Sequence, residues 1–163
     1  MKLNTCITAL CLLASTSSAQ NFGAPDDALS HRVIAGWVQE DGTQIAAIEL
    51  DLAEGWKTYW RAPGDAGIPP NFNWERARNV QSVRVQWPTP VVFWEGDMRS
   101  VGYKTRVVVP VVVTPSTQGE DVRLRGEMNL GLCADICVPV RIKLDETLPA
   151  FGANSRDLSL IHI

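Results

Sequence analysis

Two cysteines, Cys133 and Cys137, lie between two segments of alternating apolar and polar residues, and this arrangement constrains the fold more than any other feature of the chain. A period of two is typical of strands with one buried face. Pro139 lacks an N–H donor and fixes its own φ angle, which suits the start of a returning strand. The pattern predicts a β-hairpin with the cysteines at its turn, within reach of another protein. The apolar or small positions are Val122, Leu124, Gly126, Met128 and Leu130 before the pair, and Val138, Val140, Ile142 and Leu144 after it.

Short strand-like segments separated by turn residues continue this pattern through the chain. Asp41-Gly42 is a hairpin-turn signal, whereas the Pro and Gly residues of 62–71 and of 88–100 indicate loops. Pro110 places the most apolar strand at a sheet edge or a bulge. With no sustained helical periodicity, the chain is predicted to be an all-β sandwich. The remaining expected strands are 31–37, 46–52, 55–61, 72–74, 82–87 and 101–114.

The N-terminus has the features of a secretory signal peptide at residues 1–19: a basic start, a short apolar run and a small-residue end. Its removal leaves 144 of the 163 residues and two of the four cysteines, a one-domain length in a disulfide-permissive compartment. The polar residues 20–30 are expected to be a flexible lead-in, and 151–163 a tail outside the domain. The net charge of −3 gives no support for nucleic-acid binding.

The Cys-x₃-Cys spacing alone leaves three roles open. By the chain-entropy estimate, a structural disulfide that closes so short a ring adds only about 2 kcal/mol to the free energy of unfolding. A small ring at an exposed turn is more open to thiolate attack, which favours a reversible dithiol/disulfide pair. A metal site is the third option. Zinc normally takes four ligands of N, S or O type, and the only histidines of the mature chain are His31 and His162, so thiolate-bound Cu(I) is the form of metal site that the sequence favours.

Four motifs between about residues 31 and 148 match one known family. They are residues 54–61 (EGWKTYWR), Trp87-Pro88, Gly102-Tyr103 leading to Val109-Pro110-Val111, and residues 133–139 (CADICVP), the last being the most specific. Together they resemble the N-terminal periplasmic domain of the DsbD family, and more closely its ScsB-like branch and related proteins associated with cytochrome c biogenesis. The cysteine spacing here is shorter than in better-known members.

The resemblance implies an immunoglobulin-like β-sandwich over residues 31–150, located in the periplasm and working without a cofactor or metal. Such a domain takes electrons from a membrane-embedded DsbD/CcdA-like thiol reductase and passes them to periplasmic thioredoxin-like proteins. An aromatic cap loop shields the cysteines in this family, and by position it is 91–100, with Phe93 or Trp94 as the cap. Tyr59 matches a tyrosine near the cysteines, and Cys137 the cysteine that forms mixed disulfides.

Three carboxylates complete the candidate site. Asp135 lies between the cysteines, and Glu95 and Asp97 belong to the expected cap loop. Nearby carboxylates raise the pKa of a thiol and would keep the pair unreactive until a partner docks; ordinary solvation in a loop is the alternative. We further expect Cys137 to attack partners, because Val138-Pro139 begins a rigid strand, and Cys133 to resolve the mixed disulfide, because it follows a more pliable Gly131-Leu132.

The predicted function is therefore that of a periplasmic dithiol–disulfide electron carrier, an oxidoreductase-type domain whose reacting residues are Cys133 and Cys137. Two alternatives belong to other classes. One is a non-catalytic immunoglobulin-like binding module with a structural disulfide, and the other is a periplasmic copper-handling domain.

Overall fold

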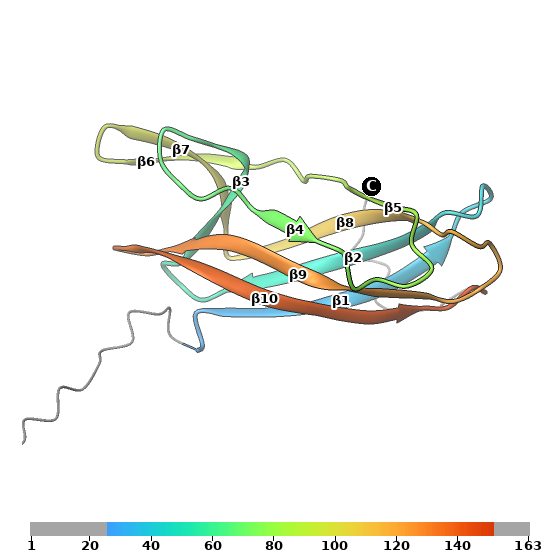
Figure 1. The fold of residues 1–163 in the computed structure, drawn as a ribbon. Helices are drawn as coiled ribbons and strands as arrows, with labels where there is room; N and C mark the ends of the chain where they lie inside the picture. The colour runs from blue at the N-terminus through green and yellow to red at the C-terminus, as the bar shows by residue number, and fades with distance from the viewer. Residues whose placement is uncertain (1–25, 152–163) are drawn as a thin grey trace, which may run out of the picture.

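The computed structural model describes residues 26–151, and this part of the chain folds into ten β-strands without a helix (Figure 1). Within these residues there is accordingly no helix able to cross a membrane. The predicted signal peptide, most of the lead-in and most of the tail lie outside the described residues. The strands are β1 (Leu29–Val38), β2 (Gln44–Leu52), β3 (Lys57–Gly64), β4 (Asn71–Asn73), β5 (Ser82–Val85), β6 (Val91–Glu95), β7 (Met98–Lys104), β8 (Arg106–Thr114), β9 (Val122–Cys133) and β10 (Cys137–Leu148).

The strands form two antiparallel sheets that pack face to face. One has the order β1-β2-β8-β5, and the other has the order β10-β9-β3-β7-β6, with β4 paired to β9. Apolar side chains from both sheets fill the space between them, which is the arrangement that a sandwich requires. The predicted all-β, immunoglobulin-like sandwich is confirmed. The core includes Ile48, Leu50, Val109, Val111 and Val113 from the first sheet, and Leu124, Met128, Leu130, Ile142 and Leu144 from the second.

The predicted cysteine hairpin is formed by β9 and β10. Its register is continuous from Val122 opposite Leu148 to Cys133 opposite Cys137. The inward-facing Leu124, Met128 and Ile142 are at most 4% exposed. Val140 is only half-buried but packs against the same core. Because side chains alternate between the two faces of a strand, the cysteines lie on the face that points away from the core.

Several strand boundaries differ from those expected. β1 begins at Leu29, two residues before the predicted start, and β3 continues beyond the predicted end at Arg61 as far as Gly64. The single strand expected over 101–114 is two strands in different sheets, β7 and β8. Thr105 joins them with a positive φ of 64°, a conformation uncommon for a β-branched residue. The apolar run continues across this change of sheet, so its periodicity does not reveal the break.

Pro110 lies in β8 next to the end of a neighbouring strand. Its carbonyl accepts a hydrogen bond from the N–H of Gln86, one residue beyond the last residue of β5. In an extended strand the N and O atoms of one residue point to the same side. The absent N–H of Pro110 therefore faces the place where β5 has ended. The expected edge position is nevertheless wrong for the strand, because β8 lies between β2 and β5 in its sheet.

The segment 91–100, expected to be an irregular loop, is a β-hairpin made of β6 and the start of β7. Its turn contains Gly96, with a φ of 60°, and Asp97. The loop prediction is wrong because β6 is apolar on both faces and so shows no alternation. Val92 and Trp94 on one face remain 51% and 64% exposed, whereas Phe93 on the other is 6% exposed. The β6–β7 hairpin and the tip of the β9–β10 hairpin project from the same end of the sandwich (Figure 1).

Candidate functional site

The cysteines close the β9–β10 hairpin as a directly opposed pair. Their Cα atoms are 4.1 Å apart, and a disulfide joins them. The turn between them is three residues long, and the N–H of Ala134 donates to the carbonyl of Ile136 across it. The two cysteines differ sharply in exposure, since Cys133 is fully buried and Cys137 is exposed. Cys137 is therefore the cysteine of the pair that is open to solvent.

Two aromatic side chains bury Cys133 on the outer face of the sheet. Tyr59 of β3 and Phe93 of β6 form a cluster with Cys133, separate from the main core. Their ring centroids are 6.1 Å apart, and Tyr59 is 1% exposed. Phe93 is thus the cap candidate that the structure brings to the pair. Trp94 points to the opposite face of β6 and is not part of the cluster.

The hydroxyl of Tyr59 lies 3.3 Å from the sulfur of Cys137. Because a disulfide sulfur carries no hydrogen, the tyrosine is the donor. Burial, and secondly the negative charge of Glu95, raise the pKa of Tyr59 above its ordinary value of 10. The phenol therefore stays protonated at neutral pH and keeps its capacity to donate to Cys137.

The segment that follows β3 covers Tyr59 and β9 from outside. A Cβ atom on Gly67, whose φ is +124°, would lie 2.5 Å from ring atoms of Tyr59, and one on Gly131 would lie 2.7 Å from Ile68. The N–H of Asp65 donates to the carbonyl of Arg99 and fixes this segment to β7. Gly67 and Gly131 are therefore needed as glycines, because any side chain would push the cover off the site. Sequence reasoning gave residues 62–71 no role beyond a loop.

Residues 20–149 match the model of the N-terminal domain of the thiol:disulfide interchange protein DsbD. The chain belongs to this family. The family predicted from the four motifs is confirmed, and the described domain is a thiol:disulfide interchange domain that contains a cysteine pair.

Two solved structures are similar to this DsbD-family domain. The crystal structure of the N-terminal periplasmic domain of ScsB from Proteus mirabilis is 30% identical, with a TM-score of 0.61, over 77% of this chain and 47% of that one. The chain thus spans about half the length of the ScsB structure. The N-terminal domain of DsbD from Neisseria meningitidis in the reduced form is 19% identical, with a TM-score of 0.47, over 80% of this chain and 94% of that one. No match to a curated protein was found.

The three predicted carboxylates occupy different positions in this DsbD-family domain. Glu95 at the end of β6 forms an ion pair with Lys57 of β3, so its charge is balanced rather than isolated beside the thiols. Asp97 is exposed in the β6–β7 turn, and Asp135 is exposed in the cysteine turn itself. Glu95 is therefore the carboxylate that the structure brings to the edge of the Tyr59–Phe93 cluster.

Lys57 and Lys104 are site residues that sequence reasoning missed. Their ammonium nitrogens lie 5.7 and 5.1 Å from the ring centroid of Phe93, within cation–π range. The two lysines are directly opposed on β3 and β7, and Lys57 is also directly opposite Cys133 of β9. The signal was present, because Lys57 precedes Tyr59 by two residues and so shares its strand face.

Metal ligands are not clustered around the cysteines. In residues 26–151 no group of three or more His, Cys, Asp or Glu side chains could hold a metal ion. His31 instead hydrogen-bonds the carbonyl of Lys143, and His162 lies outside the described residues. Among the described residues the copper-handling alternative is therefore left with the two cysteines themselves as ligands.

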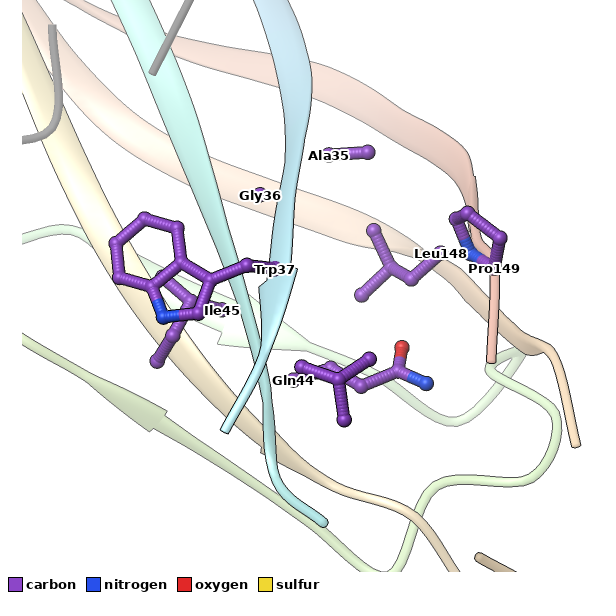
Figure 2. A pocket seen from close by; sticks show the side chains of 8 residues that line it. Ala35, Gly36, Trp37, Gln44, Ile45, Leu148 and Pro149 are labelled. Carbon is purple, nitrogen blue, oxygen red and sulfur yellow. The ribbon is translucent and has the colours of Figure 1, made fainter. Parts of the chain in front are cut away.

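A small hollow lies at the opposite end of β10 from the cysteines (Figure 2). It is about 10 Å³ in volume, and Gln44, Leu148 and Pro149 are among its lining residues. Within the described residues, the side-chain oxygen of Gln44 is buried without a hydrogen-bond partner. A space of this size admits about one water molecule, so the hollow is too small for a substrate.

Tyr59→Phe is expected to shift the pH of half-maximal alkylation of Cys137 upward by about one to two units in the reduced protein. The substitution removes a hydrogen bond to the thiolate, and a bond to a charged group contributes about 1.5–3 kcal/mol. Iodoacetamide labelling across a pH series, followed by mass spectrometry, measures this. Tyr103→Phe is the control, because the buried Tyr103 hydroxyl donates to Pro88 instead. Equal pH profiles of alkylation for wild type and Tyr59→Phe would show that the Tyr59 hydroxyl does not stabilise the Cys137 thiolate.

Proposed function

We propose that this domain carries electrons through the Cys133–Cys137 pair in the periplasm. It accepts them from a membrane-embedded DsbD/CcdA-like thiol reductase and passes them to periplasmic thioredoxin-like proteins. The predicted signal peptide and the periplasmic location of the similar ScsB domain support this compartment. The observation that carries the proposal is the unequal exposure of a disulfide on the outer face of the sheet, with Cys137 accessible and Cys133 buried under Phe93 and Tyr59.

The transfer to an acceptor is a pair of thiol–disulfide exchanges. The thiolate of Cys137 attacks the acceptor's disulfide, so one intermolecular S–S bond forms and the acceptor's own S–S bond breaks, leaving a thiolate that takes a proton. Cys133 then loses its proton and attacks the sulfur of Cys137, which releases the second acceptor thiol. Two electrons pass to the acceptor, and the domain ends as the disulfide. Reduction by the membrane donor is the same sequence in reverse.

The assignment of Cys137 as the attacking thiol is supported by burial rather than by backbone pliability. Gly131 of β9 is paired with Pro139 of β10 and covered by Ile68, so the segment before Cys133 is not the pliable one expected from the sequence. Cys133 is instead enclosed on the outer face, where only an intramolecular partner is at hand. Cys137 both faces solvent and accepts the hydrogen bond from Tyr59.

A purely structural role for the disulfide is less well supported. Cys133 and Cys137 are already paired by the hairpin register, so the bond closes a loop that the strands close themselves. By the chain-entropy estimate such a short loop contributes only about 2 kcal/mol. A structural bond also has no need of an exposed sulfur beside a buried one.

An exchange assay tests the proposed function. The reduced domain, mixed with an equimolar oxidised thioredoxin-like protein, is expected to become oxidised while the acceptor gains two thiols, as shown by alkylation and mass spectrometry. The Cys133→Ser/Cys137→Ser double variant is expected to transfer nothing. A wild-type domain that stays reduced against thioredoxin-like acceptors of higher potential would overturn the electron-carrier role and leave the binding module.

A further inference from the structure

The Lys57–Glu95 ion pair connects two strands that are not neighbours in the sheet. Lys57 belongs to β3 and Glu95 to β6, with β7 between them. Their side chains are only 15% and 24% exposed, whereas those of the Arg123–Asp145 pair are 45% and 38% exposed. Partial burial shields the Lys57–Glu95 pair from solvent screening, so it can contribute more than a surface pair does.

The strand register shows that this contact requires the hairpin to curl over the sheet. On β7, Lys104 is opposite Lys57, whereas Met98 is opposite Glu95. Six residues separate these two β7 positions, so a flat sheet would hold Lys57 and Glu95 about 20 Å apart along the strand direction. The register of β3 against β7 breaks between Tyr59 and Gly64, which permits the curl. The ion pair thus joins the tip of the β6–β7 hairpin to the first residue of β3, which lies beside the opposite end of β7.

Phe93 lies between the two ends of this connection. It is two residues from Glu95 on the same strand face, it packs on Cys133, and the Lys57 ammonium approaches its ring. β6 is an edge strand whose sheet neighbour is β7. The β7 side of the hairpin is bonded to residues 64–66 through Arg99 and Ser100, whereas on the β6 side Glu95 is bound through its ion pair with Lys57. Lys57, directly opposite Cys133, therefore anchors both the hairpin tip and the ring that covers the buried sulfur.

We propose that the Lys57–Glu95 ion pair is a latch that holds the β6–β7 hairpin, and with it Phe93, closed over Cys133. Lys57 and Glu95 are then positioning residues for the exchange reaction. When a thiolate attacks Cys137, Cys133 becomes a thiolate, and a charge in a closed apolar site is costly. Opening the hairpin lets water reach the leaving sulfur. The latch thus slows reduction of the disulfide by small thiols that are not its partners. This inference rests on the proposed electron-carrier function.

The test is the rate at which dithiothreitol reduces the oxidised domain. Lys57→Met and Glu95→Gln are each expected to raise this rate about five- to tenfold, the factor for losing an ion pair that contributes about 1–1.4 kcal/mol. The Lys57→Met result is the diagnostic one. Removing a cation beside the disulfide should by itself slow attack by an anionic thiolate and destabilise the leaving Cys133 thiolate, so an acceleration has the opposite sign to the simple charge effect.

The charge-swapped variant Lys57→Glu/Glu95→Lys is expected to return the rate towards that of wild type, because the pair is rebuilt with reversed polarity. Lys104→Met distinguishes the effect of the ion pair from that of the cation–π contact. The Lys104 ammonium approaches the ring of Phe93, but in the strand register Lys104 lies opposite Lys57 and not opposite Glu95. Glu49→Gln controls for lost stability. Glu49 bonds Arg32 and Arg106 in the other sheet, so that variant should lower the melting temperature without accelerating reduction.

Rates for Lys57→Met and Glu95→Gln at or below wild type would overturn the latch. So would equal acceleration by Glu49→Gln, because it would show that general destabilisation suffices. Failure of the latch is distinguishable from failure of the proposed function. In the first case the domain still exchanges with a thioredoxin-like acceptor while the dithiothreitol rates are unchanged. In the second case the acceptor is not reduced, whatever the dithiothreitol rates are.

Discussion

A Cys133→Ala variant is expected to accumulate a mixed disulfide with a thioredoxin-like acceptor through Cys137, whereas Cys137→Ala accumulates little. The exposed Cys137 can still attack the acceptor's disulfide when Cys133 is gone, and no second thiol then resolves the product. In Cys137→Ala the remaining Cys133 is buried beneath Tyr59 and Phe93 and cannot reach a partner. Non-reducing gels of the domain mixed with the acceptor measure the difference, which should be close to all-or-none.

The trapping experiment has two informative failures. Equal trapping by both variants would contradict the assigned roles and would mean that the cover over Cys133 opens readily. No trapping by either variant, with both folded as wild type, would contradict exchange itself. Cys133→Ala/Cys137→Ala provides the baseline for cross-links that form without these thiols.

Phe93→Ala is expected to accelerate reduction of the disulfide by dithiothreitol by about 10- to 150-fold, more than either latch variant. The factor corresponds to the loss of about 1.5–3 kcal/mol, the value of burying one large apolar side chain. Phe93 is 6% exposed, and its ring covers Cys133. Without it, water reaches the leaving sulfur even when the hairpin stays in place. Stopped-flow or quenched alkylation assays measure the rate.

Trp94→Ala is the matched control for the cap. Trp94 is adjacent to Phe93 on β6 but points to the opposite face and is 64% exposed. Its removal should leave the dithiothreitol rate within about twofold of wild type, as expected for a surface substitution worth under about 0.5 kcal/mol. Acceleration by Trp94→Ala as large as that by Phe93→Ala would mean that hairpin stability, and not cover by the Phe93 ring, controls access.

The cysteine hairpin could be predicted from sequence because its residues alternate strictly, and the all-β class because short strand-like segments alternate with turn residues. Leu124, Met128 and Ile142 occupy the core face as the period of two requires, and the cysteines occupy the opposite face. Tyr59 and Phe93 could be predicted only from the family resemblance. Nothing in the spacing of β3, β6 and β9 along the chain shows that these strands come together, since the sheet order is a property of the fold.

The features that sequence reasoning missed share a physical cause, which is that they depend on how strands curl and change sheets. The β6–β7 hairpin shows no alternation, because its apolar residues point both to the site and to solvent. The break at Thr105 separates two strands of equal apolar character. The pairing of Lys57 with Glu95 crosses an intervening strand. A local pattern of side chains contains no information about such contacts.

The redox potential of the Cys133–Cys137 pair tests the central claim most directly. Equilibration of the domain in graded dithiothreitol or glutathione redox buffers, followed by acid quenching and alkylation, gives the fraction of dithiol by mass. For an electron carrier we predict a potential between about −120 and about −270 mV, the range of thioredoxin-like exchange proteins. A potential well below about −300 mV is typical of structural disulfides, and that result would contradict electron transfer through this pair.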